Sequence, residues 1–193
     1  MLPKFLRSEA DMAVDALLLQ QVILYPTDTV WGLGCDAELP RAVEQLYQLK
    51  NRPAEKACIV LVADEAMFAR YAEVVPDNLA ELLATQTRPT TYVVPGSRHL
   101  APNLLAPDGT IGMRVVLSDE FCRLVLRRLG HGLVSTSANK SGEPSPAVFS
   151  EVAPEIIRKV DYVVNWRQDD DTRAAPSRVV RLRADGGLEV LRD

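Results

Sequence analysis

Amphipathic segments recur along the chain and predict a series of helices. Ser8 is predicted to be the N-cap of the first helix, with Asp11 three residues later and apolar positions at helical spacing to about Gln20. A second helix is predicted to begin at Pro40 and to end at Lys50. Further helices are expected near residues 64–71, 76–86, 119–129 and 148–158.

Short apolar runs between these segments predict buried strands. They lie at residues 22–25, 58–62, 91–95, 111–116, 133–136 and 162–164. The segment 27–35 is expected to be a loop, and apolar segments at 178–183 and 188–191 flank a turn sequence that is typical of a hairpin. Strands that alternate with helices indicate the α/β class. We therefore expect a single domain, residues 1–193, with a twisted open mixed sheet and helices on both faces.

Composition narrows the class of protein. The apolar share of 47% and the charged share of 25% are those of a globular domain. A net charge of −4 disfavours a protein whose whole surface binds nucleic acid, although it leaves room for a local basic cleft. Three widely spaced cysteines without a CxxC pair disfavour a disulfide framework or a zinc site. Because we find no signal-peptide core and no long apolar run, we expect a cytoplasmic protein without a membrane anchor.

The polar loop at residues 135–145 is the most informative segment. It follows the apolar pair Leu133–Val134, and its first part, Ser135 to Asn139, consists mostly of hydroxyl and amide side chains. Open α/β sheets bind their ligands at the carboxyl ends of strands, where such a loop presents hydroxyls and backbone N–H groups. A plain solvated connection is the alternative, and the segment alone does not decide between the two.

Cationic residues form the second unusual feature. Lys50, Arg52 and Lys56 lie within seven residues, where a predicted helix gives way to a loop at Pro53. They either stabilise the C-terminal end of that helix through its dipole or converge on a bound anion. Arg114 interrupts an apolar strand. On an inward face it would require an anionic partner, whereas on an exposed face it would require none.

Motifs of several other enzyme classes are absent. The sequence has no P-loop, no GxGxxG and no GxSxG, and neither His99 nor His131 lies in a motif. Ser-His-Asp hydrolysis and histidine-ligated zinc are therefore disfavoured. The polar side chains singled out by the sequence are instead fixed cations and hydroxyls, and the Pro26–Thr29 loop contributes two of the hydroxyls. Such a set suits phosphoryl or nucleotidyl transfer, in which positioning and charge neutralisation supply most of the rate.

Five motifs occur in order over nearly the whole chain: Tyr25–Gly34, Lys50-x-Arg52-Pro53, Gly112–Val115, Ser135–Gly142 and Pro176–Val180. Together they resemble the signature of the YrdC-like threonylcarbamoyl-AMP synthase family. The resemblance implies a YrdC/DHBP-synthase-like fold with a large concave cavity. It also implies a nucleotidyltransferase that joins L-threonine, bicarbonate (or CO2) and ATP into threonylcarbamoyl-AMP and pyrophosphate, for the t6A37 modification of tRNA.

The resemblance carries over specific residues wherever the motifs match. The implied catalytic set is Lys50, Arg52, Ser137 and Asn139. The implied ATP contacts are Arg52, Lys56, Thr110, Ser137, Ser145 and Arg192. The implied threonine contacts are Thr29, Arg114, Ser135 and Ser177, with Arg114 on the carboxylate of the amino acid. Magnesium is expected to arrive with the nucleotide.

The chain also departs from the family pattern. Arg88 stands where many members have glycine, Arg178 replaces the second hydroxyl of a Ser-Thr pair, and Leu61 replaces a histidine found in some members. The polar segment 165–175 is a candidate lid over the cavity. Within it, the acidic run at residues 169–171 is interpreted as a solvated loop, with metal binding as the alternative.

Two other functions stay open at this stage. The same fold with a basic cavity would also suit a non-catalytic RNA-binding module, although the net charge of −4 counts against strong nonspecific affinity. A weakly active paralogue is the other alternative, and the departure from the family pattern at Arg178 leaves it open. If the chain is a synthase, its expected partners include a downstream threonylcarbamoyl-transferase complex and a contact with tRNA or double-stranded RNA.

Overall fold

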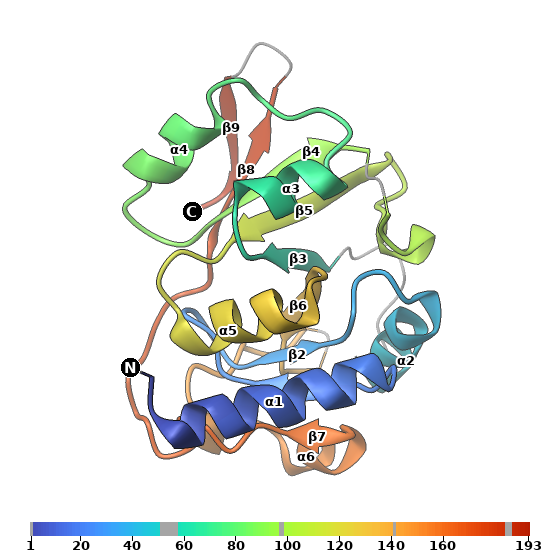
Figure 1. Cartoon of the computed structure of the whole chain (residues 1–193), viewed down its shortest axis with the longest axis vertical. Coiled ribbons are helices and arrows are strands. Elements are labelled where there is room, and N and C mark those ends of the chain that lie inside the picture. Colours follow the sequence, from blue (N-terminus) through green and yellow to red (C-terminus); the bar gives the residue numbers. More distant parts are fainter. Residues whose placement is uncertain (1, 51–57, 97–98, 141, 184–186) are drawn as a thin grey trace.

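The computed structural model describes residues 2–50, 58–96, 99–140, 142–183 and 187–193. Over these residues nine strands form one sheet in the order β7-β1-β2-β6-β3-β5-β4-β8-β9 (Figure 1). β3 runs parallel to β5, whereas β4 runs antiparallel to it, so the predicted mixed sheet is confirmed. The strands are β1 (Ile23–Tyr25), β2 (Gly32–Gly34), β3 (Ile59–Val62), β4 (Thr90–Pro95), β5 (Thr110–Val115), β6 (Leu133–Ser137), β7 (Tyr162–Val163), β8 (Arg178–Leu182) and β9 (Leu188–Arg192).

The helices follow the predicted pattern closely. They are α1 (Lys4–Leu18), α2 (Pro40–Lys50), α3 (Glu65–Tyr71), α4 (Leu79–Thr85), α5 (Glu120–Leu129) and α6 (Pro154–Lys159). The start of α5 is fixed by Asp119, whose side chain accepts a hydrogen bond of 2.7 Å from the backbone N–H of Cys122. Gly130 ends the same helix in the left-handed conformation that favours glycine.

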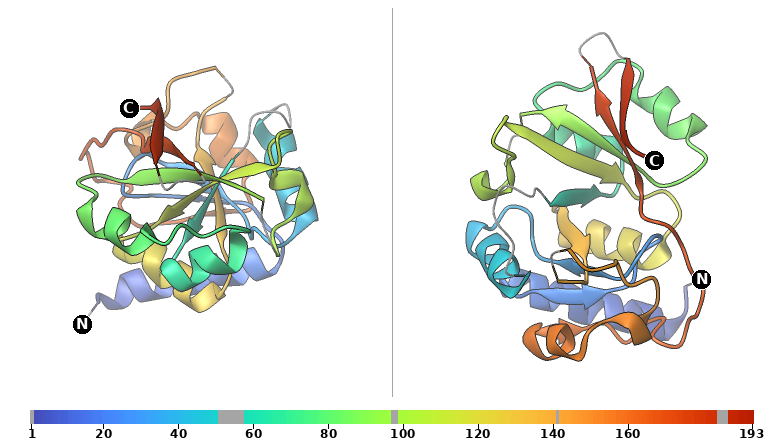
Figure 2. Two further views of the ribbon diagram at one scale, coloured as in Figure 1. Left: turned by 90° about the horizontal axis from the view of Figure 1, so that it is seen from above. Right: turned by 180° about the vertical axis from the view of Figure 1, so that it is seen from behind.

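Successive residues of a strand point to opposite faces of a sheet, and here they enter two separate cores. In β1, Ile23 and Tyr25 belong to a cluster with α1 and α5, whereas Leu24 belongs to a cluster with α2 and α6. Figure 2 shows α1 and α6 on opposite sides of β1 and β2. The prediction of helices on both faces is therefore confirmed.

Three local predictions are wrong. Ser8 is not an N-cap, because α1 begins at Lys4 after Pro3 and has no side-chain cap. The segment 27–35 is not all loop, because β2 pairs with both β1 and β6; its Gly-Leu-Gly sequence is too short and too rich in glycine to show a strand pattern. The helix expected at 148–158 is broken into the 3-10 turn Phe149–Glu151 and α6, which begins at Pro154 because proline favours the first turn.

Gly34 in β2 is required by close packing. A Cβ atom there would lie 2.6 Å from the carbonyl oxygen of Val134 and 2.8 Å from Cε1 of Tyr25. We expect Gly34→Ala to lower the free energy of unfolding by about 1–3 kcal/mol, because neighbouring strands must separate to admit the methyl group. Denaturant unfolding measures the change. Gly32→Ala is the matched control, since its Cβ would find no atom closer than 3.4 Å, and an equal loss in both variants would contradict the packing explanation.

Residues 164–177, here called the strap, connect β7 at one end of the sheet to β8 near the other (Figure 1). The start of the strap is tied to α1 by Glu9, a buried carboxylate. Its Oε2 accepts hydrogen bonds from the hydroxyl of Tyr162 at 2.8 Å and from the backbone N–H of Asn165 at 2.7 Å. The strap therefore has a defined course from its first residues onward.

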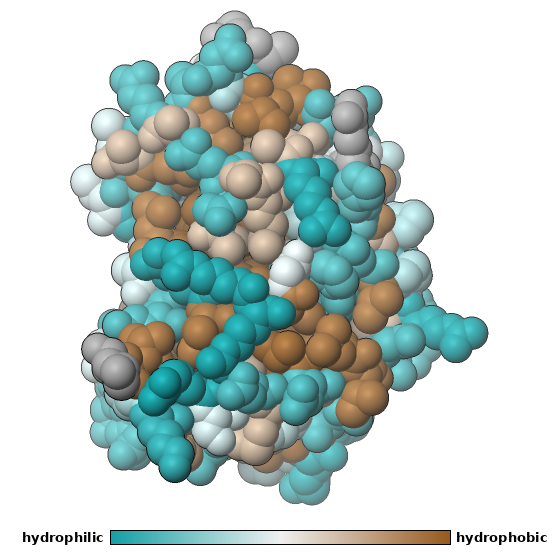
Figure 3. All heavy atoms as spheres, in the orientation of Figure 1, coloured by the Kyte–Doolittle hydropathy of each residue, from teal (hydrophilic) through white to brown (hydrophobic). Residues whose placement is uncertain are grey.

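The face of the molecule drawn in Figure 3 is covered largely by polar side chains, with apolar areas between them. Exposed apolar side chains of the chain include Leu18 and Leu19 at the end of α1 and Leu117 before α5. Of the helices in the described ranges, none combines the length and the apolar character needed to cross a lipid bilayer.

Candidate active site

A cavity of about 180 Å³ lies where strands β2, β3, β5 and β6 meet the strap and the C-terminal hairpin. Its lining is mostly polar and comes from segments that are far apart in the sequence. The lining residues are Thr27, Thr29, Val30, Gly32, Cys58, Ile59, Arg114, Ser135, Thr136, Ser137, Ser145, Pro176, Ser177 and Arg192.

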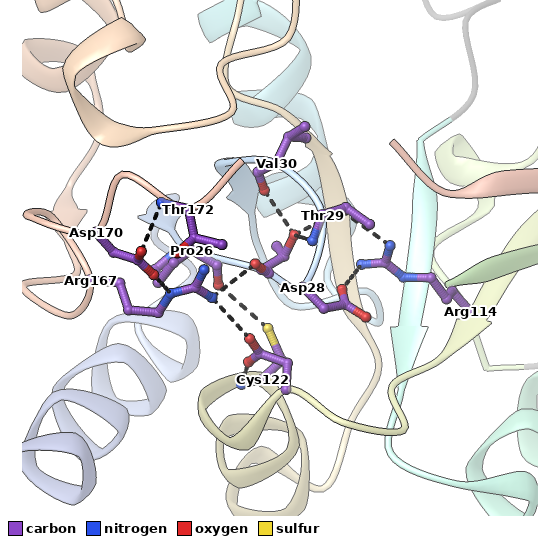
Figure 4. Close-up of polar contacts among 11 residues, drawn as sticks. Pro26, Asp28, Thr29, Val30, Arg114, Cys122, Arg167, Asp170 and Thr172 are labelled. Carbon is purple, nitrogen blue, oxygen red and sulfur yellow. Dashed lines mark hydrogen bonds and ion pairs between the residues drawn. The ribbon is translucent and has the colours of Figure 1, made fainter. Parts of the chain in front are cut away.

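The Pro26–Val30 loop forms one wall of this cavity and is held by its own threonines (Figure 4). The hydroxyl of Thr27 donates to the carbonyl oxygen of Val30 at 2.8 Å. The hydroxyl oxygen of Thr27 also accepts a hydrogen bond from the backbone N–H of Thr29 at 3.0 Å and lies 2.8 Å from the hydroxyl oxygen of Thr29. This network presents the Thr29 hydroxyl in a fixed position, as an oxygen-orienting group requires.

Arg114 lies opposite this loop on β5, and its side chain is only 2% exposed. The inward-facing alternative for this residue is therefore the correct one. Its Nη2 lies 3.0 Å from Oδ1 of Asp28, and its Nη1 donates to the Thr29 hydroxyl at 3.2 Å (Figure 4). The protein thus supplies an anionic partner of its own, because a buried guanidinium is stable only when it is paired.

β6 and the loop after it form the serine-rich wall, which contributes Ser135, Ser137 and Ser145 to the lining. Lys50, at the end of α2, is also buried at 4% exposure and donates from Nζ to the Thr136 hydroxyl at 3.1 Å and to the Ser137 carbonyl. Lys50 therefore holds the polar end of β6 from behind the cavity wall.

Asn139 continues this wall. Its Oδ1 accepts a hydrogen bond from the hydroxyl of Ser137, and its Nδ2 donates to the Lys140 carbonyl at 3.1 Å. Lys50 and Asn139 also line a neighbouring cavity of about 230 Å³, together with Leu49, Lys140, Glu155, Ile156 and Lys159. Lys50 and Asn139 thus line the second cavity and are hydrogen-bonded to Ser137, which lines the first.

The C-terminal hairpin closes the third side of the cavity. The hydroxyl of Ser177 lies 2.9 Å from that of Thr91, and the Nη2 of Arg192 donates to the Ser177 carbonyl at 2.7 Å. Ser177 is 5% exposed. The Ser177 hydroxyl therefore has a partner inside the protein. Arg192 lines the cavity, although its position at the end of the predicted hairpin did not by itself indicate a role.

The structure brings together most of the residues expected from sequence. Seven of them line the main cavity: Thr29, Arg114, Ser135, Ser137, Ser145, Ser177 and Arg192. Lys50 and Asn139 adjoin them through the hydrogen bonds described above. Thr110 is not among the lining residues, and its hydroxyl donates instead to Asp108 at 2.7 Å. Arg52 and Lys56 lie outside the described residues.

Sequence reasoning missed two carboxylates near the cavity. Asp28 belongs to the threonine-bearing loop, and the only signal for its role was the need of Arg114 for an anion. Asp119 lies at the start of α5 with a side chain 8% exposed. Burial raises the pKa of Asp119, and the charge of Asp28 raises it further, whereas the bond from Cys122 and the charge of Arg167 lower it. No sequence pattern indicated that these groups adjoin.

The polar lining of the cavity is suited to binding and positioning an anion. Burial raises the pKa of the thiols of Cys35 and Cys122, which keeps them protonated and poorly nucleophilic. Within the described ranges, no group of three or more His, Cys, Asp or Glu side chains could hold a metal ion. Arg114 and the surrounding hydroxyls are instead suited to a carboxylate or another anion.

A family model described as Telomere recombination (Sua5, YciO and YrdC) matches residues 15–193. The threonylcarbamoyl-AMP synthase of Idiomarina loihiensis is 36% identical over 164 residues, which cover 82% of this chain and 86% of that relative. The threonylcarbamoyl-AMP synthase of Vibrio cholerae is 34% identical over 183 residues, which cover 93% of this chain and 94% of that relative.

Solved structures agree with the fold. P. abyssi Sua5 complexed with L-threonine has a TM-score of 0.78 at 25% identity, and the match covers 91% of this chain and 51% of that one. The chain therefore spans about half the length of that protein. E. coli YciO has a TM-score of 0.81 at 24% identity, over 97% of this chain and 89% of that chain. By its motifs, its fold and these relatives, the chain belongs to the Sua5/YciO/YrdC family.

Proposed function

We propose that this protein is an L-threonylcarbamoyl-AMP synthase, an enzyme of the nucleotidyltransferase class. The single observation that carries the proposal is the buried Arg114 guanidinium, which faces a hydroxyl-lined cavity next to Thr29. The relatives named threonylcarbamoyl-AMP synthase support it at 34–36% identity over most of both chains. The product would serve the t6A37 modification of tRNA in the cytoplasm, through a downstream transferase complex.

The main cavity suits the amino-acid substrate. Its volume of about 180 Å³ is smaller than the roughly 300–1,000 Å³ of clefts that hold drug-sized ligands, so a small zwitterion fits better than a whole nucleotide. We assign the threonine carboxylate to Arg114 and its hydroxyl and amine to Thr29, Ser135 and Ser177. The structure of P. abyssi Sua5 complexed with L-threonine supports an amino-acid site in this fold.

ATP would bind next to the threonine site, toward the serine-rich wall, where Ser137, Ser145 and Arg192 of the cavity lining would contact it. The proposed ATP contacts are Arg52, Lys56, Thr110, Ser137, Ser145 and Arg192, with Mg²⁺ arriving on the triphosphate. The proposed catalytic set is Lys50, Arg52, Ser137 and Asn139. Placing cations and hydroxyls around the phosphates stabilises the charge that develops during transfer.

The proposed reaction has two steps. The threonine amine and bicarbonate first form a carbamate with loss of water. A carbamate oxygen then attacks the α-phosphorus of ATP, and the bond to the β-phosphate breaks to release pyrophosphate. No protein nucleophile is needed, because the carbamate is the attacking group. This agrees with a cavity whose lining residues include no histidine that could act as a base for a hydroxyl.

Pyrophosphate release by the purified protein tests this proposal. We expect release from ATP that requires both L-threonine and bicarbonate. Glycine in place of threonine is the matched control, since it keeps the carboxylate that Arg114 would bind but lacks the hydroxyl. A protein that releases pyrophosphate at the same rate without threonine, or not at all, would be inconsistent with synthase activity.

A further inference from the structure

Arg167 connects the strap to the wall of the main cavity (Figure 4). Its Nε contacts Oδ2 of Asp170 at 2.7 Å within the strap. Its Nη1 donates to the carbonyl oxygen of Thr27 at 3.1 Å and lies 3.5 Å from Oδ2 of Asp119. One guanidinium therefore joins three segments: the strap, the Pro26–Val30 loop and the start of α5.

The backbone around Arg167 is shaped for this contact. Arg167 has a φ of +60°, a left-handed conformation that residues other than glycine adopt uncommonly. Asp170 fixes the turn that follows, because its Oδ1 accepts from the backbone N–H of Thr172 at 2.9 Å while its Oδ2 binds Arg167. A strained residue is retained only where its surroundings hold it in place, and here the side-chain contacts of Arg167 do so.

The loop that Arg167 holds is the one that carries the partners of Arg114. The carbonyl oxygen of Thr27 accepts a hydrogen bond from Arg167, and its hydroxyl oxygen accepts one from the backbone N–H of Thr29. Asp28, between them, pairs with Arg114 at 3.0 Å. Thr27, Asp28 and Thr29 are consecutive. A shift of the Thr27 carbonyl would therefore also move the Asp28 carboxylate and the Thr29 hydroxyl, which contact the Arg114 guanidinium.

We propose that Arg167 is a positioning residue for the amino-acid substrate: it fixes the Pro26–Val30 loop and thereby the Arg114–Asp28–Thr29 arrangement that receives the substrate carboxylate. Arg167 itself does not line the cavity. The proposal rests on the proposed function for the identity of that substrate. On this basis the strap acts as a fixed brace of the amino-acid site.

Arg173 supplies a matched control, because it lies on the same strap and also forms an ion pair. Its Nη2 contacts Oε1 of Glu151 at 2.6 Å, but its side chain is 65% exposed and the pair does not touch the Pro26–Val30 loop. Exposed pairs of this kind contribute little to stability. Arg173→Ala thus removes an arginine from the strap without disturbing the proposed brace.

Steady-state pyrophosphate release, with threonine and ATP varied separately, tests the proposal. We expect Arg167→Ala to raise the KM for threonine roughly tenfold, because a small misplacement of a binding group is costly. The KM for ATP and kcat should change by less than about threefold. Arg167→Lys, which keeps one charged contact, should give an intermediate KM for threonine, and Arg173→Ala a wild-type one. An unchanged KM for threonine in Arg167→Ala, or an equal rise in Arg173→Ala, would overturn the proposal.

Hydrogen exchange separates this proposal from the proposed function. In Arg167→Ala, backbone amides of residues 27–30 should exchange faster than in the wild type and in Arg173→Ala, whether or not the protein is a synthase. If the wild type lacks threonine-dependent activity, hydrogen exchange alone tests whether Arg167 fixes the Pro26–Val30 loop. Unchanged exchange of residues 27–30 in Arg167→Ala would then overturn the proposal. If Arg167→Ala does not fold, Arg167→Lys takes its place in both experiments. The intermediate rise in the KM for threonine and faster exchange of residues 27–30 are then expected, and a wild-type KM together with wild-type exchange overturns the proposal.

Discussion

Lys50→Ala is expected to lower turnover at least about 100-fold, the scale on which one preorganised electrostatic contact acts in enzymes. Lys50 is buried behind β6 and donates to the Thr136 hydroxyl and to the Ser137 carbonyl. Removing its ammonium would take away a positive charge near the proposed phosphates and release the end of the strand that carries Ser137. Single-turnover measurement of pyrophosphate release would report the loss.

Lys50→Ala is also expected to lower the stability of the protein. Because Lys50 is nearly fully buried, Lys50→Ala should also lower the free energy of unfolding by about 1.5–3 kcal/mol, the range for hydrogen bonds to charged groups. Rates are therefore compared at a temperature where the variant is folded. Lys4→Ala is the control, since Lys4 is an exposed lysine of α1 and lines neither cavity. Near-normal turnover in folded Lys50→Ala would remove Lys50 from the catalytic set.

Arg114→Ala is expected to raise the threonine concentration needed for half-maximal rate at least about 50-fold, because it removes the proposed partner of the substrate carboxylate from a buried site. The same change leaves Asp28 unpaired at 13% exposure. Breaking a buried ion pair from one side costs about 3–5 kcal/mol of stability, so loss of stability and loss of binding would coincide in this variant.

A double variant separates the two effects. Arg114→Ala combined with Asp28→Ala removes both charges, and we expect it to regain part of the stability lost by Arg114→Ala. It should not regain threonine affinity, because the cation is still missing. Denaturant unfolding and threonine calorimetry measure the two quantities on the same samples. A double variant that binds threonine like the wild type would show that Arg114 acts through folding alone.

Local patterns predicted most of the secondary structure. α2 begins and ends at Pro40 and Lys50 as expected, because a proline favours the first helical turn and an apolar stripe continues to the basic end. The C-terminal strands β8 and β9 form the predicted hairpin, whose register contains an irregularity at Val179/Val180. The sequence pattern does not predict β2, because two of its three residues are glycines and its pairing depends on strands that lie elsewhere in the chain.

The candidate site was predicted less completely. The motifs singled out Thr29, Arg114 and the serines of β6, and the structure collects them around one cavity. They did not reveal that Arg114 already has an internal carboxylate, although Asp28 stood beside Thr29 in the same motif. The segment 165–175 was interpreted as a candidate lid. In the structure its Arg167 is bound to the Thr27 carbonyl, in the loop that forms one wall of the cavity, and the lid stays a prediction.

The amino-acid sequence by itself determined the order of helices and strands and the residue types of an anion-binding site, because periodicity, capping and turn chemistry act over a few neighbouring residues. Only the tertiary structure decided which charges meet. Arg114 and Thr29 are 85 residues apart, and Arg167 and Thr27 are 140 apart, so these contacts depend on strand order and on the path of the strap. Burial then makes the pairing compulsory, since a charge withdrawn from water is stable only beside its counterpart.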